Sequence, residues 1–72
     1  MSPEAATYLA KVEAMGQRPL LSDPDARRRF YTNIRIQLVR QQNLSAKGKT
    51  TQFPPSDISA LITALTHLLE ST

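Results

Sequence analysis

Apolar residues recur every three or four positions along residues 3–15, the spacing that places them on one face of an α-helix. The members of this stripe are Ala5, Tyr8, Leu9, Val12 and Met15. Ser2 is a favourable N-cap, and Pro3 suits the first helical position. Gly16 stands where a left-handed C-terminal cap is common. The pattern therefore predicts a helix over residues 3–15.

A stronger apolar stripe runs through residues 56–70. It consists of Ile58, Leu61, Ile62, Leu65, Leu68 and Leu69. Ser56 can act as the N-cap, and Asp57 places a negative charge in the first turn, where it favours the helix dipole. The remaining side is small and polar and includes Ser59, Ala60, Thr63, Ala64, Thr66 and His67. We predict a helix over residues 56–70 that permits close approach of neighbours on more than one side.

Residues 24–43 fit two secondary structures. As a strand, residues 34–38 alternate between apolar and polar, but a strand over residues 30–40 would need another chain to pair its edges. The start signal at residues 22–25, in which Ser22 or Asp23 can cap, favours a helix, as does the absence of glycine and proline in the rest of the segment. We adopt the helix and keep the intermolecular strand as the alternative. The helix aligns a set of core positions: Ala26, Phe30, Tyr31, Ile34 and Leu38.

Two connections join these segments. In the first, residues 16–22, Leu20 and Leu21 are placed to pack at the entry to the second helix. The second, residues 44–55, is predicted to be a polar, basic loop, with Phe53 anchoring it to the core. The chain is therefore expected to form one all-α domain over residues 1–72, either a small three-helix bundle or a more open helical arrangement.

The predicted middle helix has a second face opposite its core line. Arg28 and Arg35 project within about 20° of each other, because each residue advances about 100° around a helix. The residues of this face are Arg28, Thr32, Arg35, Ile36, Val39 and Arg40. Apolar side chains flanked by arginine are typical of protein interfaces. We predict that these residues bind a partner protein; the alternative is that the bundle core covers both faces of the helix.

The charges are distributed unevenly along the chain. Residues 26–56 contain seven lysines and arginines and no acidic residue, whereas the segments on either side are mildly acidic. A basic segment can bind an acidic protein surface or the phosphates of a nucleic acid. In the second case Lys47 and Lys49 would add phosphate contacts. However, the connection after the middle helix is too long for a helix-turn-helix, and no zinc-finger or RNA-recognition signature is present.

Two short motifs suggest chemistry, and neither is well supported. The run Lys47-Gly48-Lys49-Thr50 is similar to part of a phosphate-binding loop, but Asn43 stands where the first glycine is required and two prolines interrupt the helix that should follow. His67 is the one histidine, and it is expected to be a half-exposed helix residue. We therefore expect no catalytic residues, cofactor, metal or small-molecule substrate, and no enzymatic activity.

The size of the chain bears on its stability and its partners. A core of 72 residues without cysteine is thin, so we expect a homodimer or a monomer stabilised by its partner. No apolar run is long enough for a membrane span and no signal peptide is evident, which predicts a cytoplasmic protein. The sequence thus predicts a small adaptor, regulatory or assembly protein that binds a larger, acidic protein. A small nucleic-acid-binding regulator using residues 26–56 is the alternative.

Overall fold

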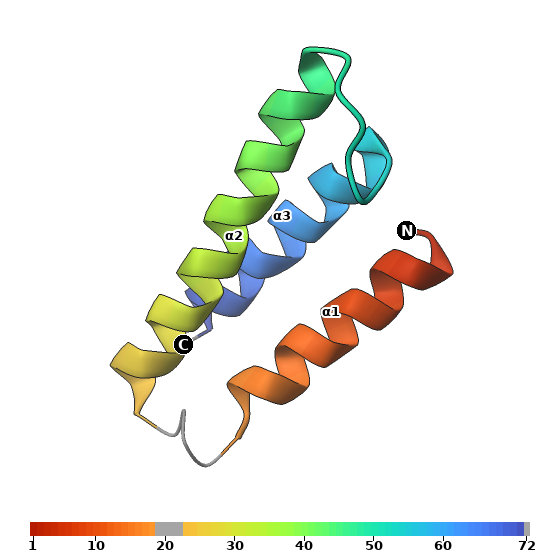
Figure 1. The fold of residues 1–72 in the computed structure, drawn as a ribbon. Helices are drawn as coiled ribbons and strands as arrows, with labels where there is room; N and C mark the ends of the chain where they lie inside the picture. The colour runs from red at the N-terminus through yellow and green to blue at the C-terminus, as the bar shows by residue number, and fades with distance from the viewer. Residues whose placement is uncertain (19–22, 72) are drawn as a thin grey trace.

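The computed structural model describes residues 1–18 and 23–71, and this part of the chain contains three α-helices and no strand. They are α1 (Pro3–Gly16), α2 (Pro24–Ala46) and α3 (Pro55–Glu70). The helices run down, up and down in the view of Figure 1, with α2 and α3 packed closely together and α1 on one side of the pair. The predicted all-α, three-helix fold is confirmed, and the strand alternative for residues 30–40 is wrong.

The first two helices begin as their sequences predict. The Ser2 Oγ accepts a hydrogen bond from the Ala5 N–H at 3.2 Å, and Asp23 Oδ1 accepts one from the Asp25 N–H at 3.1 Å. Each cap is followed by a proline at the first helical position, where its missing N–H costs no hydrogen bond. Ser22 lies outside the described residues, as do Leu20 and Leu21, which were expected to pack at the entry to α2.

The predicted N-cap of α3 is wrong, although the helix begins within one residue of its predicted start. The helix begins at Pro55, with Pro54 as an N-cap that makes no side-chain hydrogen bond, so Ser56 is already inside the first turn. The reason is the proline pair. A residue before proline is restricted to extended backbone, which is the conformation of an N-cap, and Pro54 adopts it with ψ of 156°.

The predicted end of α2 is also wrong, since the helix continues through Ala46 instead of ending near residue 43. It ends in a Schellman motif: the Gly48 N–H donates to the Ser45 carbonyl and the Lys49 N–H to the Leu44 carbonyl, both at 3.0 Å. Gly48 has a φ of +79°, which glycine adopts without steric cost. The predicted loop over residues 44–55 is therefore shorter, because residues 44–46 belong to the helix and the loop glycine, which follows the C-cap Lys47, terminates it.

Gly16 is not the left-handed cap that its position suggested. It is the last residue of α1, it is buried, and Gly48 is the one described residue with a positive φ. The ring of Tyr31 lies directly against Gly16, so that a Cβ added there would come within 2.6 Å of ring carbon Cε1 and closer still to the hydroxyl end. Gly16 is required for the close approach of α1 and α2.

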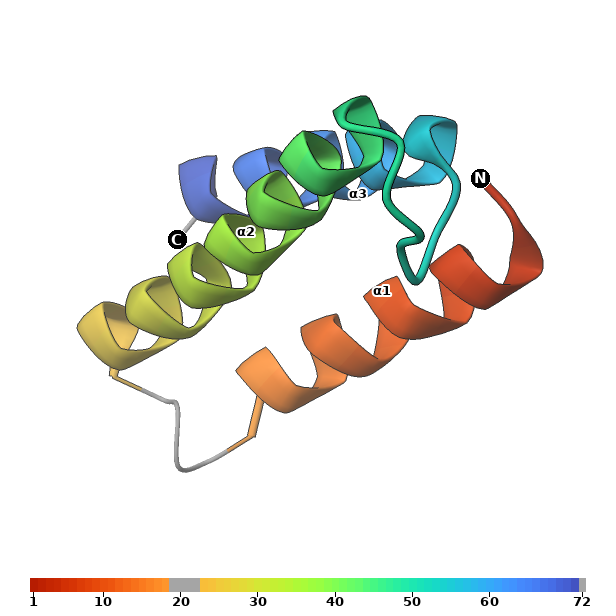
Figure 2. The same ribbon diagram turned by 45° about the horizontal axis from the view of Figure 1, so that its top comes forward.

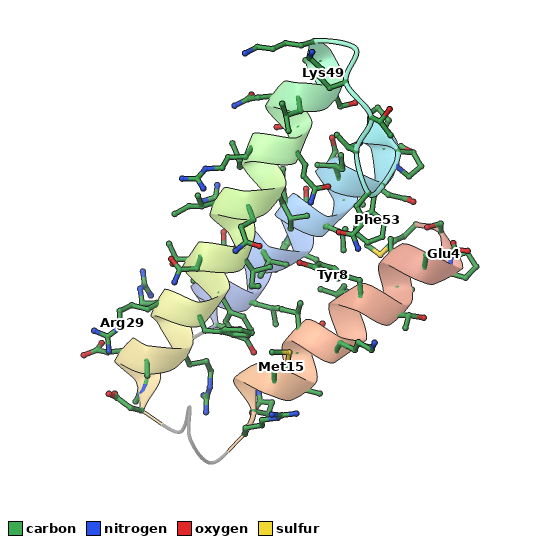
Figure 3. The ribbon with its side chains drawn as sticks, viewed as in Figure 1. Glu4, Tyr8, Met15, Arg29, Lys49 and Phe53 are labelled. Carbon is green, nitrogen blue, oxygen red and sulfur yellow. The ribbon has the colours of Figure 1, made fainter. Side chains whose placement is uncertain are left out.

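The core lies between the three helices and includes one loop residue. Its fully or nearly buried apolar side chains are Ala5, Val12, Tyr31, Leu38, Phe53, Ile58, Leu61 and Leu65. The predicted anchoring of the loop is confirmed, since the rings of Phe53 and Tyr8 pack with centroids 5.3 Å apart (Figure 3). The prediction that Met15 belongs to the core is wrong. Its side chain is 41% exposed, because it lies at the edge of the α1 stripe and Gly16 makes the contact with α2.

Helix α1 is attached less extensively than α2 and α3 are to each other, and Figure 2 shows it apart from that pair. A polar contact holds each of its ends. At the N-terminal end the Ser2 N–H donates to Asp57 Oδ1 at 3.0 Å. At the C-terminal end Arg27 Nε donates to the Gly16 carbonyl at 2.8 Å, which places a cation at the negative end of the α1 dipole.

Candidate docking face on α2

The outer face of α2 is solvent-exposed along its length. It comprises the six residues singled out from the sequence: Arg28, Thr32, Arg35, Ile36, Val39 and Arg40. Five are exposed and Val39 is half-buried; Ile36 keeps 45% of its surface in solvent. The opposite side of the helix, with Tyr31 and Leu38, supplies the core. The bundle therefore covers one face of α2, and the alternative that it covers both is wrong.

The arginines of α2 fall into two groups. Arg28, Arg29, Arg35 and Arg40 are exposed, and none forms a hydrogen bond or ion pair within residues 1–18 and 23–71. Figure 3 shows Arg29 on the side of α2 away from α1. Arg27 is half-buried and is committed to the Gly16 carbonyl. Of the three adjacent arginines, Arg27 is therefore part of the packing of α1 on α2, whereas Arg28 and Arg29 are exposed to solvent.

A shallow, open hollow lies at the N-terminal end of the outer face. We call it the arginine hollow, and it is lined by Asp25, Arg28, Arg29, Thr32 and Asn33. These residues belong to consecutive turns of one helix, and their spacing of three and four positions brings them together. That spacing was a usable signal in the sequence, but Asp25, Arg29 and Asn33 were not expected to contribute to a site.

The two loop lysines lie at the other end of α2. Lys47 is the C-cap residue of the helix, and Lys49 follows it in the Schellman motif; both side chains are exposed. Figure 3 places Lys49 and Arg29 at opposite ends of α2, a helix of 23 residues and about 34 Å. The basic residues are thus spread along the helix and do not converge on one point.

The remaining candidate motifs have structural explanations. The run Lys47-Gly48-Lys49-Thr50 follows a helix, not a strand, and its glycine ends that helix. It is therefore not a phosphate-binding loop, whose glycines precede a helix. His67 is exposed in the last turn of α3. The described residues contain no group of three or more histidine, cysteine, aspartate or glutamate side chains placed to hold a metal ion.

Asp57 is the buried charged residue that the sequence did not reveal. It is 5% exposed, and its Oδ1 accepts a hydrogen bond from the Ser2 backbone N–H. Ser2, through its side chain and its backbone N–H, holds the pKa of Asp57 below its ordinary value of 3.8, and burial opposes this with a smaller effect. The second carboxylate oxygen, Oδ2, is buried without a partner. Because Asp57 joins α3 to the start of α1, its role is structural.

Comparison of the chain with protein-family models, with curated proteins and with solved structures gives no match. Within the described part of the chain, each helix is too short or too polar to cross a bilayer.

Proposed function

We propose that the protein is a non-catalytic adaptor or assembly protein that binds an acidic surface of a larger protein through the outer face of α2. The observation that carries the proposal is Ile36, which is 45% exposed and lies among arginines that have no partner in the described chain. An exposed apolar side chain gains free energy when a partner covers it. Uncommitted arginines steer an acidic surface to the same place and can form bidentate hydrogen bonds with its carboxylates.

The centre of the outer face favours a protein over a nucleic acid. Ile36 and Val39 lie between Arg35 and Arg40 along the helix, and neither can contribute to a phosphate contact. Lys47 and Lys49, which would strengthen phosphate binding, are at the C-terminal end of α2. The alternative is a nucleic-acid-binding regulator, and the capture experiment must distinguish it from a protein-binding adaptor.

A second copy of the chain is an unfavourable occupant of this face. A twofold interface places the same patch on both subunits, so the arginines of one outer face would oppose those of the other. The homodimer predicted from the small core would therefore have to use a different surface. Light scattering over a range of concentrations tests that prediction separately, and a monomer at every concentration would contradict it.

The test is affinity capture with the tagged protein, before and after nuclease treatment, using one variant of the outer face and one matched control. Ile36→Asp places an unpaired carboxylate in the centre of the proposed interface, where it would be desolvated and would repel an acidic partner. Leu44→Asp is the control, because Leu44 is also 45% exposed on α2 but lies outside the outer face. Circular dichroism confirms that both variants keep their helices.

We expect the wild type and Leu44→Asp to capture a partner protein whose retention is unaffected by nuclease. Ile36→Asp should not capture it. The association rate of the partner protein should fall as salt is raised, since arginine steering is screened. If nuclease abolishes capture, the nucleic-acid alternative is correct. In that case Lys47→Ala should lower the salt dependence of nucleic-acid affinity by about one unit. Equal loss of capture in both aspartate variants would contradict the assignment of the outer face.

A further inference from the structure

We propose that the arginine hollow of Asp25, Arg28, Arg29, Thr32 and Asn33 receives one carboxylate of the partner, from an aspartate or glutamate side chain. This inference rests on the proposed function and specifies the chemistry of the partner. The bound carboxylate would lie at one end of the outer face of α2. Apolar side chains of the partner would then cover Ile36 and Val39 further along.

The lining of the hollow supplies the groups that a carboxylate requires. The guanidinium groups of Arg28 and Arg29 can each donate hydrogen bonds to its two oxygens, and the Thr32 hydroxyl and Asn33 amide are further donors. All of these side chains are exposed, and within the described chain none is engaged in a hydrogen bond or ion pair. A ligand therefore has no internal hydrogen bond to displace.

The charge of the lining favours a carboxylate over a phosphate monoester. Two arginines and Asp25 give the hollow a net charge of +1, which one carboxylate neutralises. A phosphorylated side chain carries about −1.5 to −2 at neutral pH, which exceeds the net charge of the hollow, and Asp25 would repel it more strongly than it repels a carboxylate. A nucleic-acid backbone carries one charge per phosphate, but at the centre of the outer face beyond the hollow Ile36 and Val39 offer it no hydrogen bond.

The distance from the hollow to Ile36 and Val39 defines how far apart the acidic residue and the apolar anchor of the partner must be. The centre of the hollow lies near residue 29, and Ile36 and Val39 are centred about eight residues further on, which corresponds to about 12 Å of helix. Both sites project on the same side of α2. If the partner segment is a helix lying along α2, its acidic residue and its apolar anchor should be separated by about seven or eight positions, or about two turns.

The experiment uses synthetic helical peptides as probes. Each is alanine-rich, with a leucine pair as the anchor and a single variable residue about seven positions away, on the same face. Glutamate, glutamine and phosphoserine are placed at the variable position. Affinities for the full chain are measured by fluorescence anisotropy, with the wild type, an Arg28→Gln/Arg29→Gln double variant and Arg40→Gln as the matched control. Arg40 is an exposed arginine of the same face that does not line the hollow.

The glutamate peptide should bind the wild type at least about fivefold more tightly than the glutamine peptide, as expected for charge-assisted hydrogen bonds at an exposed site. That ratio should fall to near one in the double variant. In Arg40→Gln the ratio should be unchanged, even if both affinities fall. If the phosphoserine peptide binds the wild type more tightly than the glutamate peptide does, the choice of a carboxylate as the ligand is wrong. A ratio that survives in the double variant, or no binding of the glutamate peptide, would overturn the site.

This outcome is independent of the capture experiment. If the peptides fail while Ile36→Asp still loses a captured protein, the carboxylate site is wrong and the outer face of α2 remains the interface. If the peptides bind as expected while capture is abolished by nuclease, the hollow binds carboxylates but the proposed function is wrong.

Discussion

Tyr31 is one of the largest side chains in the core, 1% exposed, and its hydroxyl oxygen is buried without a hydrogen-bond partner. Such a group has lost its hydrogen bonds to water and gained none in the folded state. We expect Tyr31→Phe to leave the free energy of unfolding unchanged or to raise it by up to about 1 kcal/mol. Urea denaturation monitored by circular dichroism measures this. A loss of stability above about 1 kcal/mol would mean that the hydroxyl is satisfied in solution, for example by a bound water.

Gly16 should tolerate no side chain, because the Tyr31 ring occupies the position of its Cβ. Gly16→Ala should lower the free energy of unfolding by about 1–3 kcal/mol, although alanine is the better helix former. The loss should be smaller in a Tyr31→Phe background, since that change removes the hydroxyl oxygen nearest to the added Cβ. Equal losses in both backgrounds would mean that the ring is not what excludes a side chain at Gly16.

Among the helices, the interiors and the starts of α1 and α2 could be predicted from the sequence, but the C-terminus of α2 and the N-cap of α3 could not. The α2 core line is visible in the sequence because four-residue spacing reports burial directly. The C-terminus of α2 was misplaced because Leu44, Ser45 and Ala46 are compatible with either a loop or a helix. The helix ends only where Gly48 adopts its positive φ. The N-cap of α3 was misplaced for a similar reason: two adjacent prolines preset the backbone and replace a side-chain cap.

The candidate site could be predicted in outline from the same projection. Rotation of about 100° per residue placed Arg28, Arg35 and Ile36 together on the side opposite the core, and all three are exposed. The same rule could not assign Arg27, because its contact with Gly16 depends on how α1 and α2 approach each other. The arginine hollow was missed because its shape depends on side-chain packing and not only on position around the helix.

The end of α2 provides a test at the level of the helix. No atom lies within 4 Å of a Cβ added at Gly48, so a substitution there changes the backbone preference without creating a clash. Gly48→Ala should lower the free energy of unfolding by about 1 kcal/mol, because alanine disfavours positive φ. Gly48→Asn should cost less, since asparagine tolerates the left-handed region. Chemical denaturation of both variants checks this, and an alanine variant as stable as wild type would contradict the Schellman cap.

In the whole molecule, Asp57 connects the last helix to the first, and its lowered pKa makes this connection sensitive to acid. Because the folded-state pKa is below the ordinary value of 3.8, the stabilisation is complete above about pH 5 and is lost as the pH falls through the folded-state pKa. We expect Asp57→Asn to be less stable than wild type at pH 6. The difference should shrink steadily below about pH 4.

Thermal unfolding of wild type and Asp57→Asn between about pH 6 and pH 2.5 measures this difference. The control is Glu13→Gln, which removes an exposed carboxylate of α1 that has no hydrogen-bond partner in the described chain. The difference in stability between Glu13→Gln and wild type should not change with pH in the way expected for Asp57→Asn. A constant gap between Asp57→Asn and wild type throughout the range would show that protonation of Asp57 is not involved.

The limited attachment of α1 has a consequence for the order in which the protein opens. Of the buried core residues, α1 supplies Ala5 and Val12, neither of them large, whereas the larger buried side chains belong to α2, α3 and the loop. Amide hydrogen exchange should therefore be non-uniform, with sub-global opening of α1 preceding global unfolding. At low denaturant, amides of α1 should exchange through an opening of lower free energy than those in the middle of α2 and α3. Identical opening energies in all three helices would instead identify a single cooperative unit.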